Sequence, residues 1–130
     1  MRAHAERAYP DECCGAVVGE EDGAERRVLD AWPLPNAAPA PQRRFVVAPA
    51  DYRVAERRAR DAGLRLLGFY HSHPDAPAQP STVDLASAFP YLTYVIISVE
   101  GGEARETTAW RLRDDRSRFD SEDIIWRRES

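Results

Sequence analysis

The amino-acid sequence predicts an α/β domain in which a mixed β-sheet is flanked by helices. Short apolar segments alternate with segments of helical spacing, and turn signals separate them. The chain has 130 residues and is 43% hydrophobic, which is enough for one core, and no internal repeat divides it. We therefore expect one domain over residues 1–130, most simply with three layers, and the sequence leaves the strand order open.

The N-terminal elements are expected to be a short helix and a β-hairpin. Residues 1–9 favour a helix that ends before Pro10. The apolar residues 13–19 and 26–32 are separated by an Asp-Gly pair, a strong turn signal, so they are predicted to pair as antiparallel strands. Glu12 then lies at the start of the first strand.

A proline-rich loop, a strand and a helix are predicted next. Four prolines among residues 33–41 remove backbone donors and favour an irregular, extended path. Residues 43–49, RRFVVAP, are expected to form a strand. The helix that follows has apolar residues three to four positions apart, with Asp51 as its expected N-cap and Gly63 as its stop.

Two buried strands dominate the second half of the chain. Residues 64–73 are nearly all apolar, which is typical of a central strand covered on both faces. Residues 81–89 favour a helix, and residues 91–99 a second buried strand. After a Gly-Gly turn, the alternation in residues 104–113 predicts a partly exposed strand.

The composition argues against nucleic acid and membranes as partners. There are 22 acidic and 18 basic residues, the net charge is -4 and the pI is near 5.4. No signal-peptide pattern begins the chain, and no apolar segment reaches the roughly 20 residues of a membrane span. We therefore expect a soluble, cytoplasmic protein.

The residues with the clearest chemistry lie in the segment HSHPDAPAQPSTVD, residues 71–84. Side chains two apart on a strand share a face, so His71 and His73 point to the same side. The prolines that follow end the strand, and a helix is expected to begin near Ser81. Ser81 and Asp84 then lie on neighbouring sides of its first turn, which can direct a hydroxyl and a carboxylate back towards the histidines.

Two imidazoles and one carboxylate form a ligand set typical of catalytic zinc, with water in the fourth position. Zinc lowers the pKa of such a water to about 7. A hydrolase also needs a general base and a donor to the oxyanion, for which Glu12 and Ser81 are the candidates. We therefore predict one zinc ion bound by His71, His73 and Asp84.

Simpler interpretations exist for each of these residues. Ser81 and Asp84 match a helix capping box, and a His-x-His pair on a strand is common. It is the combination of His-x-His, seven residues and Ser-x-x-Asp that favours a metal site. Among neighbouring candidates, Asp75 is expected to be a turn residue, Cys14 to fill the core and His4 to lie on the surface.

The same residues resemble the JAMM (MPN+) zinc metallopeptidases, especially their short prokaryotic members. The family signature is a glutamate at the first strand, then His-x-His, a spacer and Ser-x-x-Asp. This chain has Glu12 in PDECCG, both histidines in HSH, and Ser81 and Asp84 in STVD. No member of the motif is missing. The resemblance extends over about residues 3–110, nearly the whole chain.

The resemblance implies a fold, a set of roles and a substrate class. The fold would be the JAB1/MPN fold, which is similar to that of cytidine deaminases. His71, His73 and Asp84 would bind zinc, Glu12 would act as the general base on the zinc-bound water, and Ser81 would stabilise the oxyanion. The substrate would be a small ubiquitin-like or sulfur-carrier protein ending in Gly-Gly, from which a cysteine or a lysine-linked protein is removed.

By the same analogy, residues 33–45 would border the substrate groove. Two other functions stay open from the sequence. One is a metal-free MPN scaffold module, although such modules lack the ligands that this chain has. The other is a zinc endopeptidase acting on an unrelated peptide. The identity of the carrier protein, the group removed and the oligomeric state do not follow from the sequence.

Overall fold

The structure is a computed structural model that describes residues 1–23, 25–41, 44–122 and 125–126. The helices and strands follow in the order α1 (Arg2–Ala8), β1 (Cys14–Asp22), β2 (Glu25–Leu34), α2 (Pro49–Asp61), β3 (Arg65–Pro74), α3 (Thr82–Ser87), β4 (Thr93–Glu100), β5 (Glu103–Leu112), β6 (Phe119–Ser121) and β7 (Ile125–Trp126). Among the described residues, no helix is both long and apolar enough to span a membrane.

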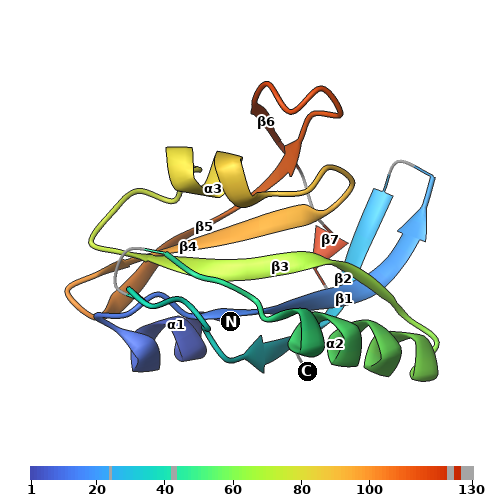
Figure 1. Ribbon diagram of the computed structural model, residues 1–130, viewed down its shortest axis with the longest axis horizontal. Coiled ribbons are helices and arrows are strands. Elements are labelled where there is room, and N and C mark those ends of the chain that lie inside the picture. Colours follow the sequence, from blue (N-terminus) through green and yellow to red (C-terminus); the bar gives the residue numbers. More distant parts are fainter. Residues whose placement is uncertain (24, 42–43, 123–124, 127–130) are drawn as a thin grey trace.

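The described strands form one mixed sheet in the order β6-β5-β4-β3-β1-β2-β7 (Figure 1). β1 pairs antiparallel with β2 and with β3, whereas β3 and β4 run parallel. Gly68 permits the close approach of β3 to β4, because a Cβ atom there would collide with the carbonyl group of Thr93. β3 therefore lies inside the sheet, as the sequence predicts.

Helices cover both faces of the sheet, which confirms the predicted α/β arrangement (Figure 1). On one face, Ala5 of α1 belongs to the same apolar cluster as Val17 and Val95. On the other, Ala55 and Ala59 of α2 pack against Ala16 and Val18, next to a cluster that also includes Leu85 of α3. Neighbouring residues of one strand serve opposite faces, as strand alternation requires.

The ends of two helices differ from those predicted, and two short strands are additional. The helix α2 begins at Pro49, with Ala48 and not Asp51 at its N-cap. Proline is favourable at that first position because its missing N–H would have no helical partner, and Asp51 lies in the first turn. The helix α3 is shorter than the predicted 81–89. The very short strands β6 and β7 were not predicted.

The predicted strand at residues 43–49 is wrong over the part that the structure describes. Residues 44–48 belong to no helix or strand. The amide of Val46 donates to the side-chain oxygen of Asn36, and the carbonyl of Val46 accepts from the amide of Ala37. The apolar pattern is strand-like, but these residues bond to the preceding loop and not to a neighbouring strand.

Candidate metal centre

The histidine pair lies at the end of β3, on the sheet face that α2 and α3 cover. His71 is completely buried and stands between Cys14 of β1 and Ile96 of β4 in the register of the sheet. His73 is 7% exposed. Ser72 points to the other face, where its hydroxyl accepts a hydrogen bond from the amide of Cys13 at 2.9 Å. The predicted alternation of these side chains is confirmed.

His73 is oriented by the loop that follows its own strand. Its Nδ1 atom lies 2.8 Å from the carbonyl oxygen of Pro77. A carbonyl can only accept, so the proton of the neutral ring resides on Nδ1 and the lone pair is on Nε2, which faces Asp84 and His71. This is the usual way in which a metal-binding histidine is fixed in tautomer and orientation.

The start of α3 returns the carboxylate of Asp84 to the histidines. The Ser81 hydroxyl accepts from the Asp84 amide at 3.0 Å, and the Asp84 carboxylate accepts from the Ser81 amide at 2.9 Å. This is a complete capping box, so the simpler interpretation of the pair is confirmed. The Asp84 carboxylate also reaches both imidazoles, so capping and participation in the site coexist.

The donor atoms of His71, His73 and Asp84 are spaced as zinc requires. The Nε2 atoms of the two histidines are 3.0 Å apart. In the Asp84 carboxylate, Oδ1 lies 3.3 Å from the Nε2 atom of His71, and Oδ2 lies 3.1 Å from the Nε2 atom of His73. Tetrahedral zinc with bonds of about 2.0–2.1 Å separates its ligands by roughly 3.3 Å. The residues present therefore fit the metal.

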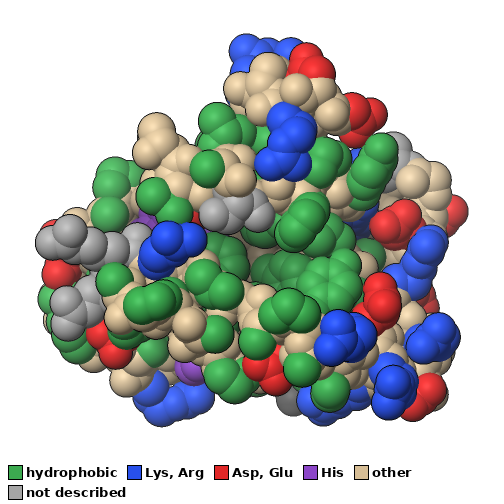
Figure 2. Space-filling view, in the orientation of Figure 1, with side chains coloured by type: hydrophobic (Ala, Val, Ile, Leu, Met, Phe, Trp, Pro, Cys, Tyr) green, Lys and Arg blue, Asp and Glu red, His purple; other side chains and the backbone are tan. Residues whose placement is uncertain are grey.

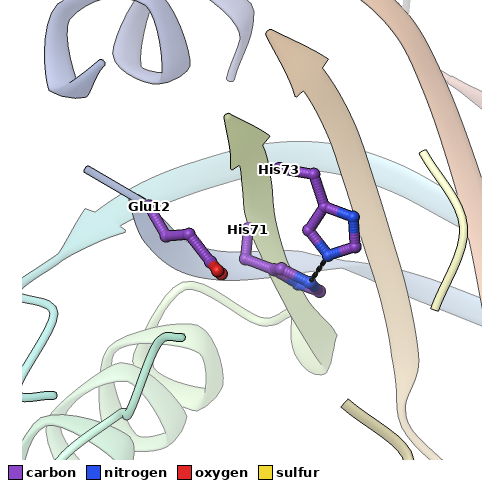
Figure 3. A group of neighbouring side chains, drawn as sticks. All are labelled: Glu12, His71 and His73. Atoms are coloured by element: carbon purple, nitrogen blue, oxygen red, sulfur yellow. Dashed lines mark hydrogen bonds between the residues drawn. The ribbon is translucent and has the colours of Figure 1, made fainter. Parts of the chain in front are cut away.

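Glu12 approaches the same point from just before β1 (Figure 3). Glu12, His71 and His73 each offer one donor atom, and these atoms all lie within 4.8 Å of one another. Glu12 is only 8% exposed, and among the described residues its Oε1 atom has no hydrogen-bond partner. A buried carboxylate oxygen is costly to leave unpaired, so its position fits a further group such as a water or a cation beside it.

Burial and mutual contacts shift the pKa values of the site. Burial raises the pKa of Glu12 to about 7, with His73 opposing and Asp84 reinforcing the shift. Burial lowers the pKa of His71, despite its contact with Asp84. For His73, burial is outweighed by the bonds to Asp84 and Pro77, so its pKa is raised. The pKa of Asp84 is lowered, because its bonds to both histidines outweigh burial.

An aromatic ring from the loop before α2 lies against His71. Phe45 stacks on His71, with the ring centroids 4.3 Å apart.

A pocket beside the site is lined by Phe45, His71, Pro80, Val83, Asp84, Ala88, Tyr94, Ile96 and Phe119. A groove that shares Phe45 and Tyr94 continues from it along Arg44, Val46, Val47, Tyr52, Phe69 and Phe89. Figure 2 shows hydrophobic side chains around a hollow on this face of the molecule.

The structure thus brings together Glu12, His71, His73 and Asp84, four of the five residues proposed from the sequence. Ser81 lies at the rim, where it is exposed and its hydroxyl oxygen is used in the capping box. Sequence reasoning missed the carbonyl of Pro77 and the ring of Phe45. The sequence carries no signal for either, because both contacts depend on loop conformation.

The neighbouring candidates have structural roles. Burial raises the pKa of the Cys14 thiol to about 12, which fits the predicted core residue. Asp75 is a turn residue as expected, with φ at 53°. The surface position expected for His4 holds only in part, because the residue is half-buried and its Nδ1 atom lies 2.7 Å from the hydroxyl of Tyr70.

The chain is similar to a known protein family and to several named relatives. Residues 1–113 match the family described as prokaryotic homologs of the JAB domain. The chain is 37% identical to a probable TtuB-protein conjugate cleaving protease of Thermus thermophilus, over 79% of this chain and 66% of that one. It is 34% identical to a desampylase of Haloferax volcanii, over 81% and 76% of the two chains. It is 33% identical to the CysO-cysteine peptidase of Mycobacterium tuberculosis, over 88% and 77%.

Coverage of the relatives varies. The chain spans just under two thirds of the Thermus protein, and 40% of a tail tip assembly protein K from Escherichia phage N15, to which it is 38% identical. Among solved structures, a Desulfitobacterium hafniense protein is 37% identical with a TM-score of 0.85, covering 99% of this chain and 87% of that one. A JAB1/MPN domain protein from Archaeoglobus fulgidus shares the fold, with a TM-score of 0.59, 19% identity and coverage of 95% and 87%. The chain belongs to the prokaryotic JAB-domain family.

Proposed function

We propose that this chain is a zinc-dependent peptidase that hydrolyses an amide or isopeptide bond at the C-terminal Gly-Gly of a small ubiquitin-like or sulfur-carrier protein. The observation that carries the proposal is the convergence of Glu12 on the triangle of donors formed by His71, His73 and Asp84. The names of three relatives, a conjugate-cleaving protease, a desampylase and a CysO-cysteine peptidase, support the substrate class.

In this proposal His71, His73 and Asp84 hold one zinc ion. Zinc, when bound, supplies an activated water and polarises the carbonyl to be attacked. Glu12 accepts a proton from the attacking water and returns it to the departing amine, a role for which a pKa of about 7 is well matched. Ser81 donates its hydroxyl proton to the oxyanion that develops on the carbonyl oxygen.

We further propose that the groove beside Phe45 receives the substrate tail. It borders the loop that the family resemblance assigns to the substrate, and it leads from Phe89 and Val47 to the histidines. Phe45 and Tyr94 line both this groove and the pocket beside the site. Glycine residues next to the scissile bond would suit such a passage, since they lack side chains and allow close approach of the backbone.

The test is a comparison of substrates with the zinc-loaded protein. One substrate is a Gly-Gly-terminated carrier protein fused to cysteine, and the other is the same carrier joined to a lysine side chain of a second protein. Cleavage of either after Gly-Gly, together with about one zinc per chain, is the expected result. Cleavage of neither would favour the endopeptidase on another peptide, and absence of zinc binding would favour the metal-free scaffold.

Two further expectations accompany the function. We propose a cytoplasmic location, since Cys13 and Cys14 are both free and buried, as expected in a reducing compartment. We also propose that residues 1–130 act as one domain. Limited proteolysis of the purified chain, followed by mass spectrometry, would test the latter by showing whether a smaller folded fragment accumulates.

A further inference from the structure

Asn36, the one asparagine of the chain, uses every hydrogen-bonding position of its side chain. Its amide nitrogen donates to the carbonyl oxygen of Glu12 at 2.9 Å and to that of Arg44 at 3.1 Å. Its amide oxygen accepts from the backbone of Ala38 and of Val46, each at 3.0 Å. One side chain therefore joins three segments of backbone that are separate in the sequence.

The first of these segments carries Glu12. Glu12 precedes β1, so its backbone is not part of the sheet ladder. Its amide donates to the carbonyl of Pro41 at 2.7 Å, and its carbonyl accepts from Asn36. Both backbone polar groups of Glu12 thus bind the loop of residues 36–41. The place of the Glu12 carboxylate depends on that loop.

The bonds of Asn36 to Arg44 and Val46 fix the segment whose Phe45 ring stacks on His71. Arg44 and Val46 flank Phe45, whose ring stacks on His71. Because residues 44–48 form no strand, the bonds to Asn36 and the bond from Ala37 to Val46 take the place of a sheet ladder. The side chain of Asn36 is thus the common attachment of Glu12 and of the Phe45 segment.

We propose that Asn36 is a positioning residue that sets the Glu12 carboxylate and the Phe45 ring relative to the histidine pair. It acts only through the backbone of Glu12 and of the residues beside Phe45. The effect on turnover rests on the proposed function, in which Glu12 is the base. The effect on the geometry of the loop does not.

An asparagine that merely shapes its own loop would need only its oxygen. The bonds from Ala38 and Val46 can be accepted equally well by an aspartate of the same shape. The bonds to the carbonyls of Glu12 and Arg44 need the amide N–H groups, which an aspartate lacks. Asn36→Asp therefore retains the bonds from Ala38 and Val46 and removes the bonds to the carbonyls of Glu12 and Arg44.

The kinetic experiment compares Asn36→Asp with the wild-type chain on the Gly-Gly carrier substrate. We expect kcat to fall roughly ten- to a hundred-fold, as is usual when a group that orients a site is lost, while zinc affinity stays within about threefold. Gln79→Glu is the matched control, because it makes the same amide-to-carboxylate change at an exposed side chain and should leave kcat unchanged. Unchanged kcat in Asn36→Asp, or a loss of activity that only follows loss of zinc, would overturn the proposal.

A second measurement needs no substrate, and its first part needs no variant. In the wild-type protein, the side-chain amide protons of Asn36 should exchange with solvent at least tenfold more slowly than those of exposed Gln79, as measured by NMR. In Asn36→Asp, the nuclear Overhauser contacts between Phe45 and His71 should weaken. Rapid exchange of the Asn36 amide would reject the proposal even if the variant did not fold. A wild-type chain that cleaves no carrier would reject the proposed function but not this geometry.

Discussion

The ring of Phe45 lies nearly parallel to the imidazole of His71, with the ring centroids 4.3 Å apart and the planes inclined by 21°. His71 is fully buried, and among the described residues its Nδ1 atom has no hydrogen-bond partner. His73, in contrast, is oriented by the carbonyl of Pro77. The two histidines are thus fixed by different means, one by aromatic packing and one by a hydrogen bond.

Phe45→Ala should therefore weaken zinc binding by about tenfold, because it removes the group that limits rotation of the His71 ring. Phe45→Tyr keeps the stacked ring and should bind zinc like the wild type. Competition with a zinc-binding dye would measure both affinities. Val54→Ala, which shortens an exposed apolar side chain on α2, serves as the control. Equal affinities of Phe45→Ala and the wild type would contradict this role.

Asp84→Asn should separate helix capping from metal binding. The amide oxygen can still accept from the Ser81 amide, so the helix start should lose only about 0.5 kcal/mol of stability. Zinc affinity should fall by a hundredfold or more, because the variant lacks the anionic ligand. Ser81→Ala should do the opposite, costing about 1 kcal/mol of unfolding free energy with zinc retained. Chemical denaturation and zinc titration of both variants would show whether the two effects separate in this way.

Glu12→Gln should keep zinc and lose turnover. Glutamine has the size of glutamate but cannot accept a proton, so kcat should drop by roughly a hundredfold or more. Metal analysis and the carrier-cleavage assay on the same preparation would test this. A variant that loses its zinc in proportion to its activity would instead make Glu12 a metal ligand, which its distance to the histidines also permits.

His4 should make the protein less stable as the pH falls below about 6.5. Burial lowers its pKa in the folded state, and the charges of Arg7 and of the N-terminus add to the shift. The unfolded chain therefore binds the proton first, and stability is lost as the pH drops from the unfolded pKa towards the folded one. His4→Asn can keep the contact with Tyr70 and does not titrate. The melting temperature of the wild type should fall relative to that of His4→Asn as the pH is lowered from 7.5 to 5.5, and parallel curves would contradict the assignment.

Asp75 should stabilise the turn after β3 through two side-chain bonds and its backbone shape. Its carboxylate accepts from the hydroxyl of Tyr9 at 2.6 Å and from the amide of Gly101 at 2.8 Å, and its φ is 53°. Asp75→Ala loses both bonds and tolerates that φ poorly, so we expect it to unfold at a lower urea concentration than the wild type. Asparagine tolerates such a φ, can accept from Gly101 through its oxygen and can donate from its amide nitrogen to the Tyr9 hydroxyl oxygen, so Asp75→Asn should be near wild type. Asp75→Gly, which loses the bonds without strain, should fall between them.

Much of the site follows from local rules that the sequence displays. Alternation along a strand places His71 and His73 on one face, and a capping box places Ser81 and Asp84 on one helical turn. Both rules act over a few residues, so they can be applied without knowing the fold. The strands around the site follow for the same reason, since their apolar runs are continuous and their turns have clear signals.

The rest of the fold and of the site depends on contacts between segments that are distant in the sequence. The pattern of RRFVVAP predicts a strand, yet residues 44–48 bond to Asn36 and Ala37 instead, and no local preference reveals that choice. Glu12 was a candidate base because a hydrolase needs one and because the family resemblance has a glutamate there, but no local rule places it beside the histidines, which are more than fifty residues away in the sequence. The sequence alone therefore predicted the candidate ligands and their local geometry. The tertiary structure decided which loop fixes Glu12 and which ring covers His71, because hydrogen bonds and packing across the chain depend on the fold as a whole.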